Sequence, residues 1–242
     1  MPRVFANAVS RIPVQIRRQP EVFFSIIYKI ISYFLIFFIS FISWVYFFVL
    51  NRTEIKGGKN ITHKKNTLYL SNHQTMIDSF LIGTAISFPA LFLKPSLLPW
   101  HPAAEENFFR NSFQSFFSNM WKCIPVRRGQ HDFHALELME NALKNSTMLI
   151  YPEGSRSRTG EISKGRPGTG KLIHDTKCTC IPVRIRGMEN ILPIGRKFPG
   201  FFKKITVSFG SEVDYSEYTK LPSSRKTSEK IIEKVMEDIR KL

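Results

Sequence analysis

Short apolar runs and amphipathic stretches alternate along the chain from residue 67 onwards. Short apolar runs bounded by turn residues are typical of buried strands, and apolar residues three and four apart are typical of helices. The expected strands are Thr67–Ser71, Ala90–Leu93, Cys123–Val126, Met148–Tyr151, Cys180–Arg186 and Ile205–Phe209. The expected helices are Ile77–Ile86, Arg110–Met120, Phe133–Lys144, Gly168–Asp175 and Ser224–Lys241. This alternation predicts an α/β fold with a mixed, mainly parallel sheet flanked by helices.

The N-terminal part of the chain has a different pattern. Residues 22–50 form one apolar stretch whose single charge is Lys29, and the segment Ile30–Leu50 carries none. As a helix, that segment would be about 31 Å long, close to the hydrocarbon thickness of a bilayer. It is longer than the apolar region of a signal peptide, and no small-residue cleavage site follows it. We therefore expect residues 1–50 to form membrane-anchoring helices and residues 51–242 to form the α/β domain.

Polar residues follow one side of this apolar helix. They lie within an arc of about 100° on a helical wheel: Ser25, Lys29, Ser32, Tyr33, Ser40 and Ser43. Such a stripe favours a helix that lies against protein or in the bilayer interface, although serine also packs between spanning helices. Basic residues flank both ends, so the positive-inside rule selects no orientation. Both arrangements stay open, and an amphipathic stretch over residues 4–12 adds a second candidate anchor.

The net charge of +16 narrows the class of partner. A strongly basic chain attracts phosphates, whether of nucleic acids, anionic lipids or phosphorylated small molecules. With a membrane segment present, a lipid surface fits better than DNA, and no zinc-finger or RNA-binding signature occurs. The three cysteines are an odd number and indicate reduced thiols. We expect membrane lipids as partners, no nucleic acid, no metal and no cofactor.

A histidine and an aspartate follow the first expected strand. His73 and Asp78 belong to Asn-His-Gln-Thr-Met-Ile-Asp, directly after the apolar run Leu68–Leu70. On a helix, five residues correspond to about 500°, so the two side chains would point about 140° apart. A turn that leads into a helix can instead fold Asp78 back onto the imidazole, which fixes its tautomer and suits a general base. The alternative is a surface histidine beside a helix-capping aspartate.

Three further blocks follow along the chain. They are Cys123-Ile124-Pro125-Val126-Arg127-Arg128-Gly129, Tyr151-Pro152-Glu153-Gly154-Ser155-Arg156 and Ile181-Pro182-Val183. Together with the His73 block, in this order and at this spacing, they resemble the four motifs of the glycerolipid acyltransferase family. The lysophosphatidic acid (1-acyl-glycerol-3-phosphate) acyltransferases are its best-known members. The resemblance covers about residues 60–215.

The resemblance implies roles for individual residues. His73 would be the general base and Asp78 would orient it. The glycerol phosphate of the acceptor would be bound by Arg128, Glu153, Gly154, Ser155 and Arg156. This chain has Tyr151 where members usually have Phe, and Ser155 where they usually have Thr, which bears on acceptor preference more than on activity.

The role of several other candidate residues stays open. Arg127 stands where members often carry an acidic residue, so which of Arg127 and Arg128 reaches the phosphate stays open. Asn72 and Lys94 are further candidates for the site. The last block has no chemical groups, and it is either an apolar wall for the acyl chain or a core strand: Ile181, Pro182 and Val183.

The reaction follows from these parts. Esterification of a hydroxyl by a thioester requires a base, a holder for the phosphate and donors for the oxyanion. The hydroxyl of the substrate is the nucleophile, and no Gly-x-Ser-x-Gly elbow occurs. We expect acyl transfer from acyl-CoA or acyl-carrier protein to a lysophospholipid, first of all 1-acyl-glycerol-3-phosphate, giving phosphatidic acid. Lyso-ornithine lipid, glycerol-3-phosphate and other lysolipids stay open as acceptors, and so does a catalytically silent lipid-binding membrane protein.

The resemblance also implies a location. It implies a membrane protein held to one leaflet, with its active site on the cytosolic face (of the cytoplasmic membrane in a bacterium).

The run Gly165–Lys171 mimics a nucleotide-binding P-loop. A P-loop needs Ser or Thr after the lysine, and Leu172 follows here, which argues against a nucleoside triphosphatase.

Overall fold

The computed structural model describes residues 22–92, 94–129, 132–157 and 160–242. Contacts divide the chain into two units, Met1–Leu35 and Ile36–Leu242. The described part of the first unit is the beginning of helix α1 (Val22–Trp44), where Ile30 and Phe34 are exposed. The amphipathic stretch over residues 4–12 lies outside the described residues.

The second unit begins with the end of α1, which continues into a π-helical turn, η2 (Val45–Leu50). Ile36, Ser40, Ser43 and Phe47 are buried and recur at helical spacing. The opposite side is apolar and exposed, with Phe37, Phe38, Phe41 and Ile42. The two serines of the polar stripe that belong to this unit thus face protein.

One helix among the described residues, Ile30–Leu50, is long and apolar enough to cross a membrane by length and composition. In the structure, residues 36–50 belong to the second compact unit. The boundary expected from the sequence lies after residue 50. The assignment of residues 1–50 to membrane anchoring and of residues 51–242 to a separate domain stays a prediction.

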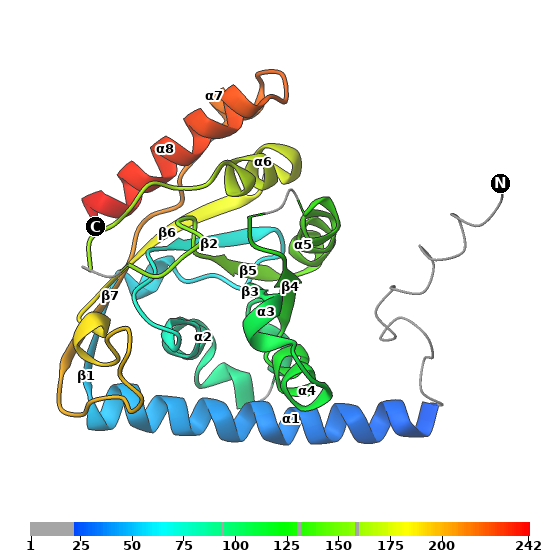
Figure 1. Ribbon diagram of the computed structural model, residues 1–242, viewed down its shortest axis with the longest axis vertical. Helices are drawn as coiled ribbons and strands as arrows, with labels where there is room; N and C mark the ends of the chain where they lie inside the picture. The colour runs from blue at the N-terminus through cyan, green and yellow to red at the C-terminus, as the bar shows by residue number, and fades with distance from the viewer. Residues whose placement is uncertain (1–21, 93, 130–131, 158–159) are drawn as a thin grey trace, which may run out of the picture. The chain divides into compact units, whose positions relative to one another are not determined.

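A five-stranded sheet forms the centre of the second unit (Figure 1), in the order β1-β7-β6-β2-β5. Its strands are β1 (Arg52–Lys56), β2 (Thr67–Ser71), β5 (Thr147–Ile150), β6 (Thr179–Arg186) and β7 (Lys204–Phe209). The pairs β1–β7, β2–β6 and β2–β5 are parallel, and β6–β7 is antiparallel. This arrangement confirms the mixed, mainly parallel sheet.

A second, two-stranded parallel sheet joins β3 (His101–Ala104) to β4 (Cys123–Val126). Trp100 connects it to β5, because its backbone N donates to Thr147 O at 3.0 Å and its O accepts from Leu149 N at 2.7 Å. The strands β2, β5, β3 and β4 therefore run in the same direction, and their carboxyl ends lie at the same edge.

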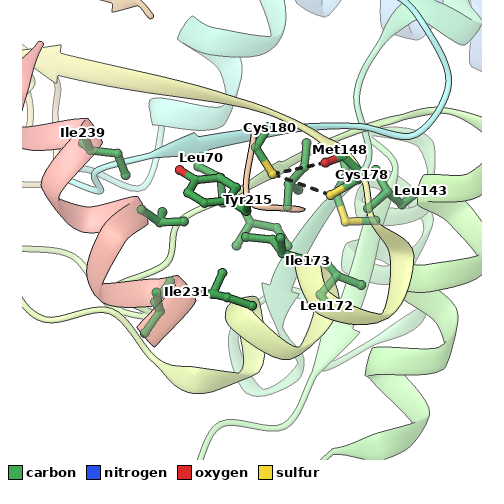
Figure 2. Packing of buried hydrophobic residues seen from close by; sticks show 14 of the residues in the cluster. Leu70, Leu143, Met148, Leu172, Ile173, Cys178, Cys180, Tyr215, Ile231 and Ile239 are labelled. Carbon is green, nitrogen blue, oxygen red and sulfur yellow. Dashed lines mark hydrogen bonds between the residues drawn. The ribbon is translucent and has the colours of Figure 1, made fainter. Parts of the chain in front are cut away.

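Helices cover both faces of the large sheet (Figure 1). In β2, Leu68 and Leu70 belong to one buried cluster and Tyr69 to the other, as strand alternation requires. The first cluster contains residues of α5 (Phe133–Asn145), α6 (Pro167–Thr176) and α8 (Arg225–Lys241). Figure 2 shows Leu70 of β2, Leu172 and Ile173 of α6 and Ile231 and Ile239 of α8 as members of this cluster. The second cluster contains the buried side of α2 (Asp78–Ser87).

The glycine-rich run that mimics a P-loop serves packing. A Cβ atom at Gly170 of α6 would lie 2.1 Å from Ser228 O of α8, so only glycine allows these two helices to approach so closely. The remaining elements are short: α3 (Glu105–Phe108), α4 (Ser112–Met120), α7 (Ser216–Thr219), η3 (Gly58–Asn60), η4 (Ala90–Phe92), η5 (Pro95–Leu97) and η6 (Met188–Asn190).

Two expectations about elements were wrong. The run Ala90–Leu93 is not a strand: Ala90–Phe92 forms the 3₁₀ turn η4, and the strand of this region is His101–Ala104. A four-residue apolar run between Pro89 and Pro95 has no periodicity that separates strand from helix. The sequence analysis expected no strand between residues 51 and 66, but β1 lies there, an edge strand whose charged residues interrupt the apolar pattern.

Candidate active site

The loop between β2 and α2 is fixed at its start by a buried amide. Asn72 lies directly after β2, and its Nδ2 donates to Ile185 O at 2.9 Å while its Oδ1 accepts from Ile185 N at 2.7 Å. Gln74 adds a second tie, because its Oε1 accepts from Met188 N at 3.1 Å. Asn72 therefore acts on the conformation of this loop rather than as an open ligand.

The carboxylate of Asp78 organises the loop. It is fully buried, and its Oδ2 lies 2.9 Å from His73 Nδ1 while accepting from the backbone N of Gln74 (2.6 Å) and of Thr75 (2.9 Å). Its Oδ1 accepts from Thr75 Oγ1 at 2.6 Å. The structure confirms that the turn folds Asp78 back onto His73. The carboxylate binds residues that precede the helix, so it is not a helix cap.

This contact defines the state of the imidazole. The carboxylate oxygen can only accept, so neutral His73 carries its proton on Nδ1 and presents Nε2 as an acceptor. The His73 side chain is 15% exposed, whereas that of Asp78 is fully buried. Among the described residues, no group hydrogen-bonds to Nε2. The nitrogen available to a substrate is thus the one that a general base would use.

The ring of Tyr151 covers one face of His73. The two ring centroids are 4.1 Å apart and the planes differ by 15°. The Tyr151 hydroxyl is buried and has no hydrogen-bond partner among the described residues. Burial, together with the charge of Asp78, holds the pKa of Tyr151 well above its usual value, so the hydroxyl stays protonated.

The loop after β5 lies against the His73 loop. Glu153 is 2% exposed, and its Oε1 accepts from His73 N at 2.9 Å. Its Oε2 accepts from Ser163 N (2.9 Å) and Ser163 Oγ (2.6 Å). Ser157 N donates to His73 O at 2.8 Å. The structure therefore brings this block to His73, and the Glu153 carboxylate holds two loops together.

The turn at Gly154 places guanidinium groups beside this junction. Gly154 has φ +68°, and a Cβ there would lie 2.7 Å from Arg166 Cδ, so both backbone conformation and space require glycine. Arg166 Nε donates to Glu153 O at 3.2 Å. Ser155 is exposed, and Arg156 is half-buried with no carboxylate partner among the residues described. An arginine without a carboxylate partner, in a loop that is bonded to His73 through Ser157 N, is suited to a phosphate ligand.

The basic residues of the second block lie farther along the same edge. Arg127 and Arg128 follow β4, and both are exposed. Arg127 Nε pairs with Glu105 Oε2 at 2.8 Å, and Arg128 Nε lies 3.7 Å from Glu106 Oε1. Within the described part of the chain, neither arginine bonds to His73 or to the loop after β5. Both follow the carboxyl end of β4, and each lies near a carboxylate of α3 in an exposed pair.

The last block belongs to the core. Ile181 and Val183 are buried in the cluster that packs on α2, and Pro182 is also buried. Of the two readings for Ile181-Pro182-Val183, the core strand fits these positions. Lys94 is exposed after η4, outside any strand. Within the described ranges, no group of three or more His, Cys, Asp or Glu residues could hold a metal ion.

A cavity of about 470 Å³ is lined by Gln74, Ser157, Glu189, Pro193 and Ile194. Gln74 follows His73 and Ser157 follows Arg156 in the chain, so the cavity borders the two loops that carry these candidates. Its lining does not include His73 or Arg156 themselves. Ser163 and Ser157 were not foreseen as part of the site. Their contribution is a backbone contact or a short hydroxyl, for which the sequence has no signal.

Known proteins are similar to this chain in sequence. A family model described as Acyltransferase matches residues 52–186. The N-acylphosphatidylethanolamine synthase of Arabidopsis thaliana is 31% identical over 129 residues, 51% of this chain and 45% of that protein. The tafazzin of Drosophila melanogaster is 27% identical over 144 residues (57% and 38%). The chloroplastic 1-acyl-sn-glycerol-3-phosphate acyltransferase BAT2 of Brassica napus is 23% identical over 154 residues (60% and 40%).

Similarity in structure extends over more of the chain. The crystal structure of the 1-acyl-sn-glycerophosphate (LPA) acyltransferase PlsC from Thermotoga maritima superimposes with a TM-score of 0.62 at 20% sequence identity. It covers 90% of this chain and 89% of that one, so the two share a fold. In contrast, the chain spans less than half the length of the three curated relatives above.

Proposed function

The chain belongs to the acyltransferase family, and we propose that it moves a fatty acyl group from a thioester to the free hydroxyl of a lysophospholipid. The proposed acceptor is 1-acyl-glycerol-3-phosphate and the product is phosphatidic acid. The donor is acyl-CoA or acyl-carrier protein. The observation that carries the proposal is the 2.9 Å contact of a buried carboxylate with His73, beside a loop with an unpaired arginine.

The chemistry uses the free nitrogen of the imidazole. Nε2 of His73 takes the proton of the acceptor hydroxyl as its oxygen bonds to the thioester carbonyl carbon. The buried charge of Asp78 stabilises the imidazolium that forms. When the tetrahedral intermediate collapses, the carbon–sulfur bond breaks and the imidazolium returns its proton to the leaving thiolate. The products are the ester and the free thiol, so protons and electrons balance.

The arginines bind the phosphate of the acceptor. We assign the first contact to Arg156, because it lies next to Ser157, whose backbone N is bonded to His73 O. Arg128 can join by leaving Glu106, since an exposed ion pair at 3.7 Å contributes little. Glu153 serves this site by positioning: both of its oxygens already accept bonds from His73 and Ser163.

The test is direct turnover. Detergent-solubilised protein is incubated with a labelled acyl thioester and a panel of acceptors, and the products are identified by mass spectrometry. We expect ester formation with 1-acyl-glycerol-3-phosphate and a loss of about 10²–10⁴-fold in H73A, the usual contribution of a general base. H134A, a change at an exposed histidine of α5, is the matched control. No His73-dependent product from any acceptor would refute the proposal.

The panel also separates other acceptors. It includes glycerol-3-phosphate, lyso-ornithine lipid, other lysolipids and phosphatidylethanolamine, because one relative is named an N-acylphosphatidylethanolamine synthase. A catalytically silent lipid-binding protein would bind lysolipid without turnover, and H73A would not change its binding. The free Nε2 speaks against that alternative, since passive binding needs no base.

A further inference from the structure

The connection between β6 and β7 carries a concentrated apolar surface. Four of its side chains are large, apolar and exposed: Ile194 (45%), Phe198 (78%), Phe201 (50%) and Phe202 (79%). A single exposed apolar residue is ordinary, but four within nine positions indicate an interaction site. We call residues 193–204 the aromatic-basic loop.

Cations alternate with these aromatic residues. Arg196, Lys197, Lys203 and Lys204 are exposed, and residues 193–204 contain no acidic residue. Lys204 lies 3.8 Å from Glu54, a weak surface pair, and no carboxylate pairs with the other three among the described residues. Aromatic side chains beside unpaired cations fit a surface that is apolar inside and anionic outside.

The aromatic-basic loop is held firmly at the end of the apolar helix. Gly200 O accepts from Tyr46 Oη at 2.5 Å, and Phe202 N donates to Leu50 O at 3.1 Å. The rings of Tyr46 and Phe201 meet edge to face, with centroids 5.5 Å apart. The same π-helical turn exposes Val49. Exposed apolar side chains therefore occur on both of these bonded segments, Val49 on η2 and Phe201 and Phe202 on the loop.

We propose that the aromatic-basic loop seats the protein on an anionic phospholipid bilayer. The rings enter the interfacial region, where aromatic side chains are favoured, and the cations meet lipid phosphates. Each cation near such a surface raises partitioning about fivefold. A protein partner is the less suitable occupant, because the loop is bonded to the end of a helix composed like a membrane segment.

The position of the loop gives this contact a consequence for the reaction. Pro193 and Ile194 line the same cavity as Gln74, which follows His73 in the chain, and Ser157, whose backbone N donates to His73 O. A bilayer that holds the loop would face the mouth of this cavity, and a lysolipid could reach the base without leaving the lipid phase. This second step rests on the proposed acyl transfer, whereas the membrane contact itself does not.

The contact is measured by site-specific labelling of the full chain in bilayer nanodiscs. The native Cys123, Cys178 and Cys180 are buried, so an environment-sensitive fluorophore would react with a new surface thiol in F198C or F202C. E233C on the exposed side of α8 is the matched control. We expect blue-shifted emission at 198 and 202, quenched by nitroxide-bearing lipids in anionic nanodiscs. Emission at both sites equal to that of E233C would overturn the proposal.

Charge reversal tests the anionic partner. R196E/K197E and the control K226E/K230E change the net charge equally, but only the first alters the aromatic-basic loop. We expect R196E/K197E to weaken quenching of the F198C label and to raise KM for a bilayer-borne acceptor at least about 25-fold, with kcat unchanged. Equal quenching in zwitterionic and anionic nanodiscs would overturn the lipid assignment. The fluorescence of the labels measures membrane contact without any turnover. A negative result for the membrane contact can therefore be distinguished from a negative result for acyl transfer.

Discussion

Replacement of Asp78 by Asn separates the charge of this residue from its hydrogen bonds. The amide oxygen can still accept from His73 Nδ1 and from the backbone N of Gln74 and Thr75, while the amide NH₂ can donate to Thr75 Oγ1. The fold should therefore survive. What disappears is the negative charge next to the imidazolium that forms during the reaction.

The size of the effect follows from the geometry. Two unit charges 2.9 Å apart interact by about 6 kcal/mol at an effective dielectric constant of about 20. A neutral hydrogen bond to the amide retains about 1 kcal/mol of this. Screening through the part of His73 that is exposed lowers the difference further, so we expect a loss of about 3–5 kcal/mol. Since about 1.4 kcal/mol is a factor of ten, kcat should fall by roughly 10²–10⁴.

The assay is release of free thiol from the acyl thioester at saturating acceptor, with the melting temperature measured on the same preparations. D214N is the matched control, because Asp214 is an exposed aspartate whose carboxylate accepts from Ser216. We expect D214N to keep the wild-type kcat. A D78N protein with wild-type melting temperature and a kcat within about threefold of wild type would contradict the electrostatic role of Asp78.

Three further outcomes follow from the site and the core. E153Q replaces one carboxylate oxygen by an NH₂ group, so it should lose the bond to either His73 N or Ser163 N and lower both kcat and the free energy of unfolding, the latter by about 1–3 kcal/mol. Unchanged thermal stability would count against the contact between the two loops. Y151F should keep kcat within about threefold and gain about 1 kcal/mol of stability, because the buried hydroxyl is unpaired; a much larger loss of kcat would mean that the hydroxyl touches substrate. Burial lowers the pKa of His101 from 6.5 to about 4, so between these values the unfolded chain binds a proton that the folded chain does not. Stability should fall by up to about 3 kcal/mol as pH drops through this window, and denaturant titrations should show H101Q with a flatter profile.

Most of the sheet could be predicted from the sequence because each strand is a short apolar run. Thr67–Ser71 and Cys123–Val126 have the predicted bounds. The five-residue spacing allowed the contact of His73 with Asp78 but also allowed a surface histidine beside a helix-capping aspartate. The resemblance of the four blocks favoured the contact, and the structure has it at 2.9 Å.

Contacts between distant segments could not be predicted in this way. Glu153 reaches His73 N across 80 positions, and this bond exists because β5 lies next to β2 in the sheet. The strand β1 and the turn at Ala90–Phe92 were misjudged because neighbours in space, not the pattern of residues, define them.

The sequence alone determined the fold class and the apolar N-terminal segment, because both depend on the pattern of apolar residues within short stretches. It identified the candidate base with its carboxylate through the resemblance of four ordered blocks to a known family, since the spacing of His73 and Asp78 by itself left two readings open. The tertiary structure decided that Glu153 is a link between loops, that α3 carboxylates hold Arg127 and Arg128, and that the aromatic-basic loop lies at the end of the apolar helix. Each of these depends on strand order and on the packing of elements far apart in the chain. Hydrophobic burial fixes that order only when the whole chain is folded.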